Sequence, residues 1–501
     1  MPPELLKLSK QELAEKFWAE KTANENAQFE ILRLQDRIDW FRRQMFGDKS
    51  ERHVPVTNKS QLTLDLGLEP GTQDEETKTE TITYKRTVKT NRKEKPVRLP
   101  FPAHLRREVT VIKPEGDLTG MVKIKEITSE FLEEKPGEVY VSQIVREVYA
   151  YKNDPDKGVI TPDLPTYVLP KFSVGVSMMA LIIIRKYADH LPLYRQIEIY
   201  KRASLILVDS TVGDWVRSGL NMLIPLLDVQ EKLIFSSPYI EADETGIRVL
   251  DRNKKGTTHK GWYWQYQDPL RGLIWFDYQP GRDASGPHKR LDSFQGYLQT
   301  DGYKVYDRFE SKPGITLLAC WAHARRYYEQ ALKNDKARAE YVLSQIRLLY
   351  SIERFADKVG LIYEERRQLR QENATPILTE LKKWLVENLP QVSQQSAIGK
   401  AISYSLGRWE KLLVYLQKGE LRIDNNLAEN AIRPIALGRK NYLFAGSHES
   451  ANRGAMIYSL LATCKRHNIN PYEYLKDVLA RISSHPINQL EDLLPHVWKR
   501  A

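Results

Sequence analysis

The stretch PYIEADETGIRVLD at residues 238–251 begins a run of three strand-like segments in quick succession, and this run is the main indication of the fold class. KGWYWQYQD (260–268) and LRGLIWFDYQ (270–279) follow after short turns. Runs of aromatic and β-branched residues bounded by turn residues are typical of strands, and short connections favour antiparallel pairing. The sequence therefore predicts an antiparallel meander of three strands.

The residues after the meander continue with alternating helix-like and strand-like patterns. Residues 284–295 indicate a helix, and GYLQTDGYKVYDRF (296–309) indicates a strand that ends at Asp301, then a short helix. ITLLACWAHARRYYEQAL (315–332) is typical of a buried strand that leads into a helix. With one late helix this is the element order of a ribonuclease H-like domain. We therefore expect a multidomain α/β chain with a ribonuclease H-like mixed-sheet core.

The late helix is predicted in DNNLAENAIRPIALGRKNYLFAG, residues 424–446. Asp424 can accept a hydrogen bond from a free N–H at the helix start. Pro434 and Gly438 are expected to end the helix, and Arg439 and Lys440 then bring positive charge close to it. A carboxylate on this helix followed by cations suits a site for a metal ion and a polyanion.

Three carboxylates from separate elements form the predicted site. Asp243 lies in the first strand of the meander, Asp301 ends the fourth strand, and Glu429 lies on the late helix. Hard divalent cations take oxygen ligands, and two such ions can activate a water or a 3′-hydroxyl and stabilise the leaving oxygen of a phosphodiester. The pattern alone leaves alternatives open, because Glu241 or Glu244 can replace Asp243.

Each of the other two carboxylates also has a structural alternative. Asp301 precedes Gly302 and can simply shape a turn. Glu429 can form an ordinary surface pair with Arg433, one helical turn later.

Composition favours nucleic acid as the partner. The 501 residues carry a formal net charge of +11, and a basic chain of this kind suits a polyanion. The two cysteines, Cys320 and Cys464, are far apart and support neither a zinc spacing nor a disulfide framework. We find no signal core, no apolar run long enough for a bilayer, no Walker motif and no GxSxG. These features predict a cytoplasmic, nucleoid-associated protein that binds no membrane.

The N-terminal half is expected to contain four segments. Residues 1–47 indicate a helix whose apolar seam fits a coiled coil and self-association, with packing on its own chain as the alternative. Residues 48–98 are too polar for a core and predict a flexible linker. Residues 99–160 suggest a small β-rich module, and residues 161–236 a helical, helix-turn-helix-like segment. The seam consists of Ala27, Ile31, Leu34, Ile38, Phe41 and Met45.

The C-terminal half is expected to divide the catalytic core. Its first part is residues 237–330, and its last part is residues 416–466, before a helical tail at 467–501. Residues 331–415 read as helices between the two parts, one of them beginning at a cap on Thr375. The other carries an apolar stripe of Val342, Ile346, Leu349, Ile352 and Ala356.

Seven motifs spread over nearly the whole chain resemble those of one family, the insertion-sequence-66 family of bacterial DDE transposases. The motifs are FRRQMFGDKSER (41–52), LPLYRQ (191–196), EADET (241–245), TDGY (300–303), CWAHARR (320–326), DNNLAENAIRPIALGRKNYLFAGS (424–447) and LEDLLPHVW (490–498).

The resemblance implies an activity and its residues. The catalytic and metal-binding triad falls on Asp243, Asp301 and Glu429, which settles the choice of Asp243 over Glu244. The family's chemistry implies Mg²⁺ or Mn²⁺, with two ions expected, DNA cleavage at terminal inverted repeats and joining of the 3′ ends to target DNA. It also implies a helical insertion in the core and companion proteins encoded by the same element. Many members carry paired CxxC motifs before the helical segment, but residues 100–160 lack cysteine, so we expect no zinc.

Six basic residues are predicted to contact double-stranded DNA, both transposon ends and target, in a homo-oligomer. They are Arg217, Arg325, Arg326, Arg433, Arg439 and Lys440. Two alternatives remain open: a catalytically inactive DNA-binding regulator, and a structure-specific nuclease of the same fold. A cleavage assay on labelled terminal repeats with a divalent metal separates these functions.

Overall fold

The computed structural model describes most of the chain from residue 101 to residue 500. The predicted coiled coil and linker lie outside the described residues. Gaps within the range are residues 115, 117, 120, 136, 152–157, 166–172, 251–256 and 284.

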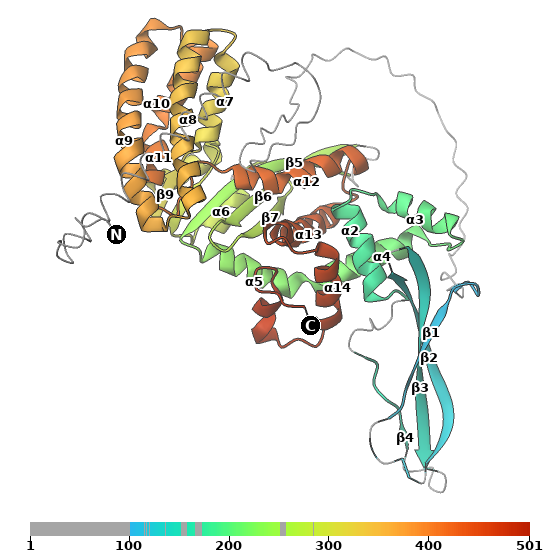
Figure 1. Cartoon of the computed structure of the whole chain (residues 1–501). Coiled ribbons are helices and arrows are strands. Elements are labelled where there is room, and N and C mark those ends of the chain that lie inside the picture. The colour runs from blue at the N-terminus through green and yellow to red at the C-terminus, as the bar shows by residue number, and fades with distance from the viewer. Residues whose placement is uncertain are drawn as a thin grey trace, which may run out of the picture. The chain divides into compact units, whose positions relative to one another are not determined.

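The chain forms two compact units. In the described part of the chain, the first unit contains residues 224–470 and 488–499. The second contains residues 101–223 and 471–487, together with Arg500. Figure 1 labels the elements of both units. No helix in the described ranges is long and apolar enough to cross a membrane.

The first unit is built on a five-stranded mixed sheet, and the predicted meander is confirmed. Its strands are β5 (Tyr239–Leu250), β6 (Thr258–Asp268), β7 (Leu273–Gln279), β8 (Gly296–Gln299) and β9 (Ile315–Leu318). The order is β7-β6-β5-β8-β9. β5, β6 and β7 pair antiparallel, whereas β8 pairs parallel with both β5 and β9. The predicted strand ending at Asp301 is thus shorter, because β8 ends two residues earlier.

The edge strand β7 is covered by the helix α13 (His448–Arg466). The backbone N–H of Phe276 donates to Ser459 Oγ at 2.9 Å, and that of Ile274 donates to Thr463 Oγ1 at 3.1 Å. An edge strand exposes unpaired backbone groups that can template aggregation. The hydroxyls of α13 therefore satisfy this edge while the helix buries its apolar face.

Helix α12 (Asn426–Tyr442) does not end where the sequence suggested, and that prediction was wrong. It continues through Pro434 and Gly438. A proline inside a helix removes one backbone hydrogen bond. This loss is offset by burial of an apolar stripe that includes Ile432 and Ile435. Figure 1 shows α12 beside β5, and the following residue Ala445 pairs with the end of that strand.

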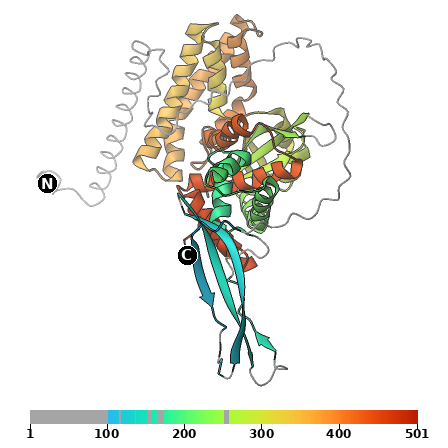
Figure 2. The same cartoon turned by 90° about the vertical axis from the view of Figure 1, so that its right-hand side faces the viewer.

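The predicted helical insertion consists mainly of long helices, which lie side by side in Figures 1 and 2. The stripe predicted from Val342 to Ala356 is confirmed as buried. The predicted helix start at Thr375 was wrong, because that residue lies inside a longer helix. The helices are α7 (Trp321–Ala331), α8 (Lys336–Val359), α9 (Tyr363–Asn388), α10 (Ala397–Gly407) and α11 (Trp409–Leu413).

Shorter helices complete the first unit. Those with α geometry are α5 (Ile224–Phe235) and α6 (Ser285–Leu291), the second shorter than the predicted 284–295. The 3₁₀ segments that begin in this unit are η3 (Lys304–Ser311), η4 (Leu389–Gln391) and η5 (Val414–Leu416), and η6 (Ile487–Leu493) lies almost wholly in it.

A fully buried arginine joins the insertion to the chain that leads into α12. Arg370 on α9 donates to both carboxylate oxygens of Glu353 on α8, each at 2.7 Å. Its other donors reach the backbone carbonyls of Tyr415, Lys418 and Leu421 at 2.7–2.9 Å. One side chain therefore fixes two helices and the connection from residue 415 to residue 421.

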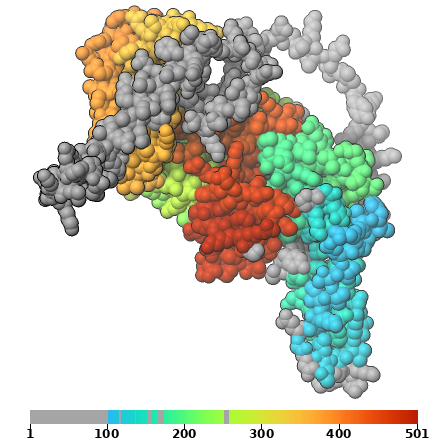
Figure 3. All heavy atoms as spheres, viewed as in Figure 1, coloured from blue at the N-terminus to red at the C-terminus, as the bar shows by residue number. Residues whose placement is uncertain are grey.

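The second unit contains a small sheet in the region where the sequence predicted a β-rich module. Its strands are β1 (Arg107–Ile112), β2 (Met121–Lys135), β3 (Glu138–Tyr151) and β4 (Val159–Ile160). The order is β1-β3-β2, and β4 pairs with β3. Figure 2 shows these strands as a long, narrow ribbon, and its atoms are the blue and cyan spheres in Figure 3.

Four helices accompany this ribbon in the second unit: α2 (Val176–Tyr187), α3 (Leu193–Arg202), α4 (Asp209–Met222) and α14 (Pro471–Arg481). The helix pair α3 and α4 agrees with the predicted helical segment, with its connector at residues 203–208.

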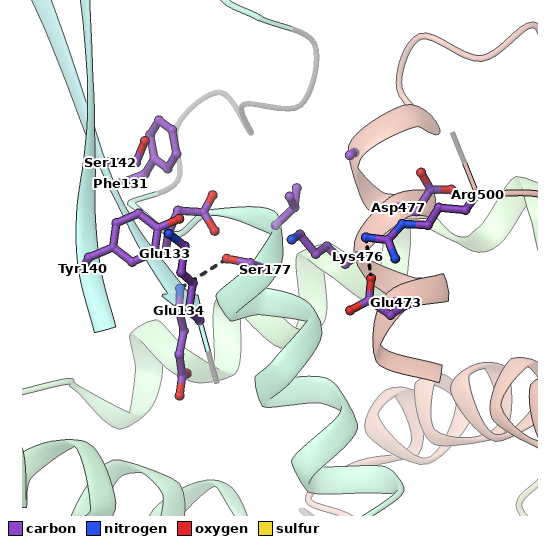
Figure 4. A pocket seen from close by; sticks show the side chains of 13 residues that line it. Phe131, Glu133, Glu134, Tyr140, Ser142, Ser177, Glu473, Lys476, Asp477 and Arg500 are labelled. Atoms are coloured by element: carbon purple, nitrogen blue, oxygen red, sulfur yellow. Dashed lines mark hydrogen bonds and ion pairs between the residues drawn. The ribbon is translucent and has the colours of Figure 1, made fainter. Parts of the chain in front are cut away.

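A buried carboxylate connects the ribbon to the start of α2. Glu133 accepts a hydrogen bond from the backbone N–H of Ser177, and a Cβ at Gly175 would collide with its carboxylate. Lys476 on α14 faces it across a cavity of about 480 Å³, shown in Figure 4. Burial raises the pKa of Glu133 to about 7, although the charge of Lys476 and the Ser177 N–H oppose this shift and the charge of Glu108 adds to it.

We expect Arg370→Met to destabilise the first unit by about 3–5 kcal/mol, because the substitution leaves Glu353 buried without its cation. Chemical denaturation of the full chain measures the change. The double variant Arg370→Met/Glu353→Gln is the control, and it should recover part of the lost stability. A single variant as stable as the wild type would contradict the assigned role.

We also expect stability to depend on the ionisation of Glu133. A pKa of about 7 in the folded state exceeds the ordinary value of 4.5. The proton therefore stabilises the folded state below pH 4.5, and this contribution disappears as pH rises through 7. As the pH rises from 5 to 8, the free energy of unfolding of Glu133→Gln should therefore increase by about 2 kcal/mol relative to that of wild type.

The measurement for Glu133 is the midpoint of unfolding of both full-length chains across this pH range. Glu138→Gln, at an exposed position on β3, should show the same pH dependence as wild type. Parallel curves for wild type and Glu133→Gln would refute the assignment.

Candidate active site

The register between β5 and β8 brings two of the predicted carboxylates together. The parallel pairing ends with Glu241 opposite Gln299. Asp243 lies two residues after Glu241, and Asp301 lies two residues after Gln299. Their charges interact, since Asp301 is one cause of the raised pKa of Asp243. Strand pairing therefore places side by side two acids that lie far apart in the sequence.

Asp243 and its neighbour Glu244 are partly exposed in an otherwise buried part of β5. Its Oδ1 accepts a hydrogen bond from the backbone N–H of Glu244 at 2.7 Å. Burial, and then the charges of Asp301, Glu244 and Glu429, raise the pKa of Asp243 well above its usual value. The site thus gathers more negative charge than it neutralises, which is the condition in which a carboxylate cluster attracts cations.

Asp301 is held by a tight turn. Its Oδ1 accepts a hydrogen bond from the Tyr303 N–H at 2.8 Å, and Gly302 between them has a φ of 88°. Arg408 from the insertion donates to the carbonyl of Gly302 at 2.8 Å. Burial raises the pKa of Asp301, although the charges of Arg282, Arg408 and Arg326 oppose that shift. The expected turn role of Asp301 therefore coexists with its place in the cluster.

Three residues at the site were missed as participants by the sequence reasoning. Glu244, considered only as a substitute for Asp243, receives hydrogen bonds from Arg282, the closer at 2.6 Å. Arg282 also lies 4.1 Å from the ring centre of Tyr303 and 4.5 Å from that of Trp262. Arg408 completes the set. Nothing in the sequence marks the two arginines, because each reaches the site from a loop or insertion far from the motifs.

Glu429 lies on the first turn of α12, and Asp424 supports that turn. Asp424 Oδ1 accepts a hydrogen bond from the Asn426 N–H at 3.1 Å, and its Oδ2 accepts one from the hydroxyl of Tyr350 on α8 at 2.6 Å. The helix cap is nevertheless Asn425, one residue later than predicted. These contacts fix where the first turn begins, and with it the position of Glu429.

The partners of Glu429 come from α7 and not from its own helix. Arg326 Nη2 donates to Oε1 at 3.1 Å and to Oε2 at 3.2 Å. His323 Nε2 lies 3.5 Å from Oε1. Burial lowers the pKa of His323 to about 4, so this ring is neutral near pH 7. Both residues belong to the CWAHARR motif, and Arg326 replaces the Arg433 partner that the sequence suggested as an alternative.

The donors of this cluster suit a hard divalent cation, because they are carboxylate oxygens in a site of excess negative charge. In the described part of the chain, Oδ2 of Asp243 and Oδ2 of Asp301 accept no hydrogen bond from the protein. As placed, however, no three His, Cys, Asp or Glu side chains of the described residues are close enough to hold a metal ion. The chemistry fits a metal, and Glu429 is engaged by Arg326 instead.

The other predicted DNA-binding residues fall into two groups. Arg325 donates to Glu329 at 2.8 Å, Arg217 pairs with Asp214 on α4, and Arg439 donates to the carbonyl of Gly246. On α12, Lys440 is exposed and Arg433 is partly exposed, and among the described residues neither forms an ion pair. Their roles toward DNA stay predictions.

The aromatic and cysteine residues of the site region are mostly structural. Trp264 and Trp275 are buried, whereas Trp262 is partly exposed and its ring carries Arg282 and Lys260. Cys320 is buried, as the packing interpretation of this residue predicted. Its neighbour on α7 is also buried and donates from its indole nitrogen to the carbonyl of residue 412 at 3.0 Å.

Comparisons with known proteins cover almost the whole chain. The family model described as Transposase IS66 family matches residues 171–453, and that described as IS66 C-terminal element matches residues 459–496. A third, described as Transposase C of IS166 homeodomain, matches residues 33–110. No solved structure matches the chain.

Similar proteins occur in Sinorhizobium fredii, each of them named as an uncharacterized protein. The protein y4hP is 33% identical over 94% of this chain and 89% of its own length. The protein y4jD is 33% identical over 80% of this chain and 81% of its own, and y4qI is 32% identical over 96% and 90%. The family match over residues 171–453, together with these relatives, shows that the chain belongs to the IS66 family of transposases.

Proposed function

We propose that this chain is a DDE transposase with a ribonuclease H-like core, which cleaves DNA at the terminal inverted repeats of its element and joins the 3′ ends to target DNA. What supports the proposal is the parallel pairing of β5 with β8, which leads to Asp243 and Asp301, together with the charges of Asp301 and of Glu429 on α12, which both act on Asp243. Family membership implies transposition and DNA binding. The order β7-β6-β5-β8-β9, with three antiparallel strands followed by two parallel ones, supports the proposed core.

Asp243, Asp301 and Glu429 would hold Mg²⁺ or Mn²⁺, with two ions as the working number. When bound, the metal supplies charge stabilisation at the phosphodiester and lowers the pKa of a water or a 3′-hydroxyl. The charges of Asp301 and Glu429 both raise the pKa of Asp243, so we propose that Asp243 would act together with these two acids in holding the metal.

The chain's own residues prepare this site before any ligand arrives. Tyr303 N–H and the Gly302 turn fix the Asp301 carboxylate, while Arg408 holds the turn from the insertion. Arg282 donates a hydrogen bond to Glu244 and so holds the carboxylate of this fourth acid in one orientation. Fixed oxygens need little reorganisation when a substrate binds, which is the physical basis of preorganised catalysis.

Phosphate binding is assigned to the exposed cations of α12. Arg433 and Lys440 lie on the helix that carries Glu429, and neither is neutralised by an acid among the described residues. Arg439 on the same helix is directed to the Gly246 carbonyl, so we assign it to anchoring α12 on β5. Self-association through residues 1–47, and companion proteins of the element, stay predictions.

We expect Asp243→Asn and Glu429→Gln to bind terminal-repeat DNA like wild type and to lose cleavage by more than about a hundredfold, since even metal-site residues outside the ligand set change activity by about 10–100-fold. Cleavage of labelled terminal repeats with Mg²⁺, alongside a gel-shift assay, measures both properties. Asp292→Asn, at an exposed acid away from the cluster, is the matched control. Normal nicking by either site variant would remove that residue from the catalytic set.

We expect Arg433→Ala to weaken DNA binding similarly for all sequences and to reduce the slope of log K against log salt by about 1, because each phosphate contact releases about one counterion. Binding isotherms between 50 and 200 mM salt give the slope. Lys333→Ala, a cation remote from α12 in the sequence, serves as the comparison. An unchanged slope for Arg433→Ala would exclude a phosphate contact.

A further inference from the structure

The two arginines of the CWAHARR motif have different partners, although they are adjacent in the sequence. Arg325 donates to Glu329 one turn along its own helix α7. Arg326 crosses to α12 and donates to both oxygens of Glu429. Its side chain is still 41% exposed, whereas that of Glu429 is 11% exposed. Arg326 therefore joins a nearly buried acid of the proposed site to solvent.

Arg326 is also close to a second acid of the same site. Its charge is one of those that lower the pKa of Asp301. Glu429 in turn is one of the groups that raise the pKa of Asp243. The guanidinium of Arg326 thus binds the same Glu429 oxygens that the proposed function assigns to a metal ion. A metal and a guanidinium cannot both take both oxygens of Glu429, so the two compete.

The Arg326 contact can be exchanged more easily than the contacts of the other two arginines. Arg282 is bonded to Glu244 and stacked near two aromatic rings, and Arg408 donates to a backbone carbonyl. Within the described part of the chain, Arg326 forms hydrogen bonds with the carboxylate of Glu429 alone. A planar guanidinium binds phosphate with the same fork that it uses for carboxylate. A DNA phosphate can therefore replace Glu429 as its partner.

We propose that Arg326 is a positioning residue that holds Glu429 in a metal-free resting arrangement, and that DNA backbone phosphate releases Glu429 to the metal by taking over Arg326. This inference rests on the proposed function. His323 supports the resting arrangement from the same helix, 3.5 Å from Oε1 of Glu429. The exchange makes metal binding and DNA binding mutually reinforcing, and such coupling acts equally in both directions.

The test is the affinity of the full-length protein for Mn²⁺, measured without DNA from the signal of the free ion in electron paramagnetic resonance. Arg326→Ala should bind Mn²⁺ about tenfold more tightly than wild type, because the competing cation is gone. Arg325→Ala is the matched control and should leave Mn²⁺ affinity unchanged. The double variant Arg326→Ala/Glu429→Gln should lose the gain, since the released carboxylate is missing.

The second measurement adds a duplex that carries the terminal repeat. This DNA should raise the Mn²⁺ affinity of wild type several-fold, and it should raise the Mn²⁺ affinity of Arg326→Ala by a smaller factor. Arg326→Lys, which keeps the charge but not the fork, should resemble wild type without DNA and so guards against a variant that merely misfolds.

The outcomes separate the two proposals. If Arg326→Ala binds Mn²⁺ no more tightly than wild type, while wild type cleaves DNA, the inference on Arg326 is overturned and the proposed function stands. If Arg326 had only a structural role, Arg326→Ala would misplace Glu429 and would bind Mn²⁺ less tightly than wild type. If no variant and no wild-type protein binds Mn²⁺, with or without DNA, the proposed function itself fails.

Discussion

The parallel pairing of β5 with β8 is the constraint on which the proposed site depends, because it sets Asp243 and Asp301 side by side. Burying neighbouring carboxylates is unfavourable, and the raised pKa of Asp243 expresses that cost. The chain offsets it with guanidinium groups, since Arg282, Arg326 and Arg408 all lower the pKa of Asp301. The pairing of β5 with β8 therefore brings like charges together, and arginines from three other parts of the chain reduce this repulsion.

The third acid depends on the helical insertion, although the insertion contributes no acid to the proposed triad. The hydroxyl of Tyr350 on α8 donates a hydrogen bond to Asp424, which also accepts one from the N–H of Asn426 at the start of α12. Arg370 on α9 binds three carbonyls in the connection that precedes this start. Glu429 follows within one turn. The insertion thus braces the helix start that positions Glu429, which explains physically why a long insertion can separate Asp301 from Glu429 without loosening the site.

The sequence predicted the strands and the buried helix stripes well, because alternation and period report burial directly. It failed at Pro434 and Thr375, where local helix-breaking or capping signals were overridden by the tertiary burial of α12 and α9. It proposed three acids, and one of them, Asp243, needed the motif resemblance to be chosen over Glu244. It did not find Arg282 or Arg408, or that Glu429 pairs with Arg326, because these contacts join segments whose separation carries no local pattern.

Arginine is the cation that suits such a site, and the reason lies in what each acid must do. Glu244 is held by Arg282, whose guanidinium also lies over the rings of Tyr303 and Trp262 and so has further contacts that fix it. Glu429 is held by Arg326, which has no such stacking partner among the described residues, and this is why the proposed exchange assigns the release to this contact. A lysine would present a point charge, whereas the guanidinium fork fits carboxylate and phosphate alike. The difference between a fixed and an exchangeable arginine therefore follows from what surrounds each guanidinium, not from its charge.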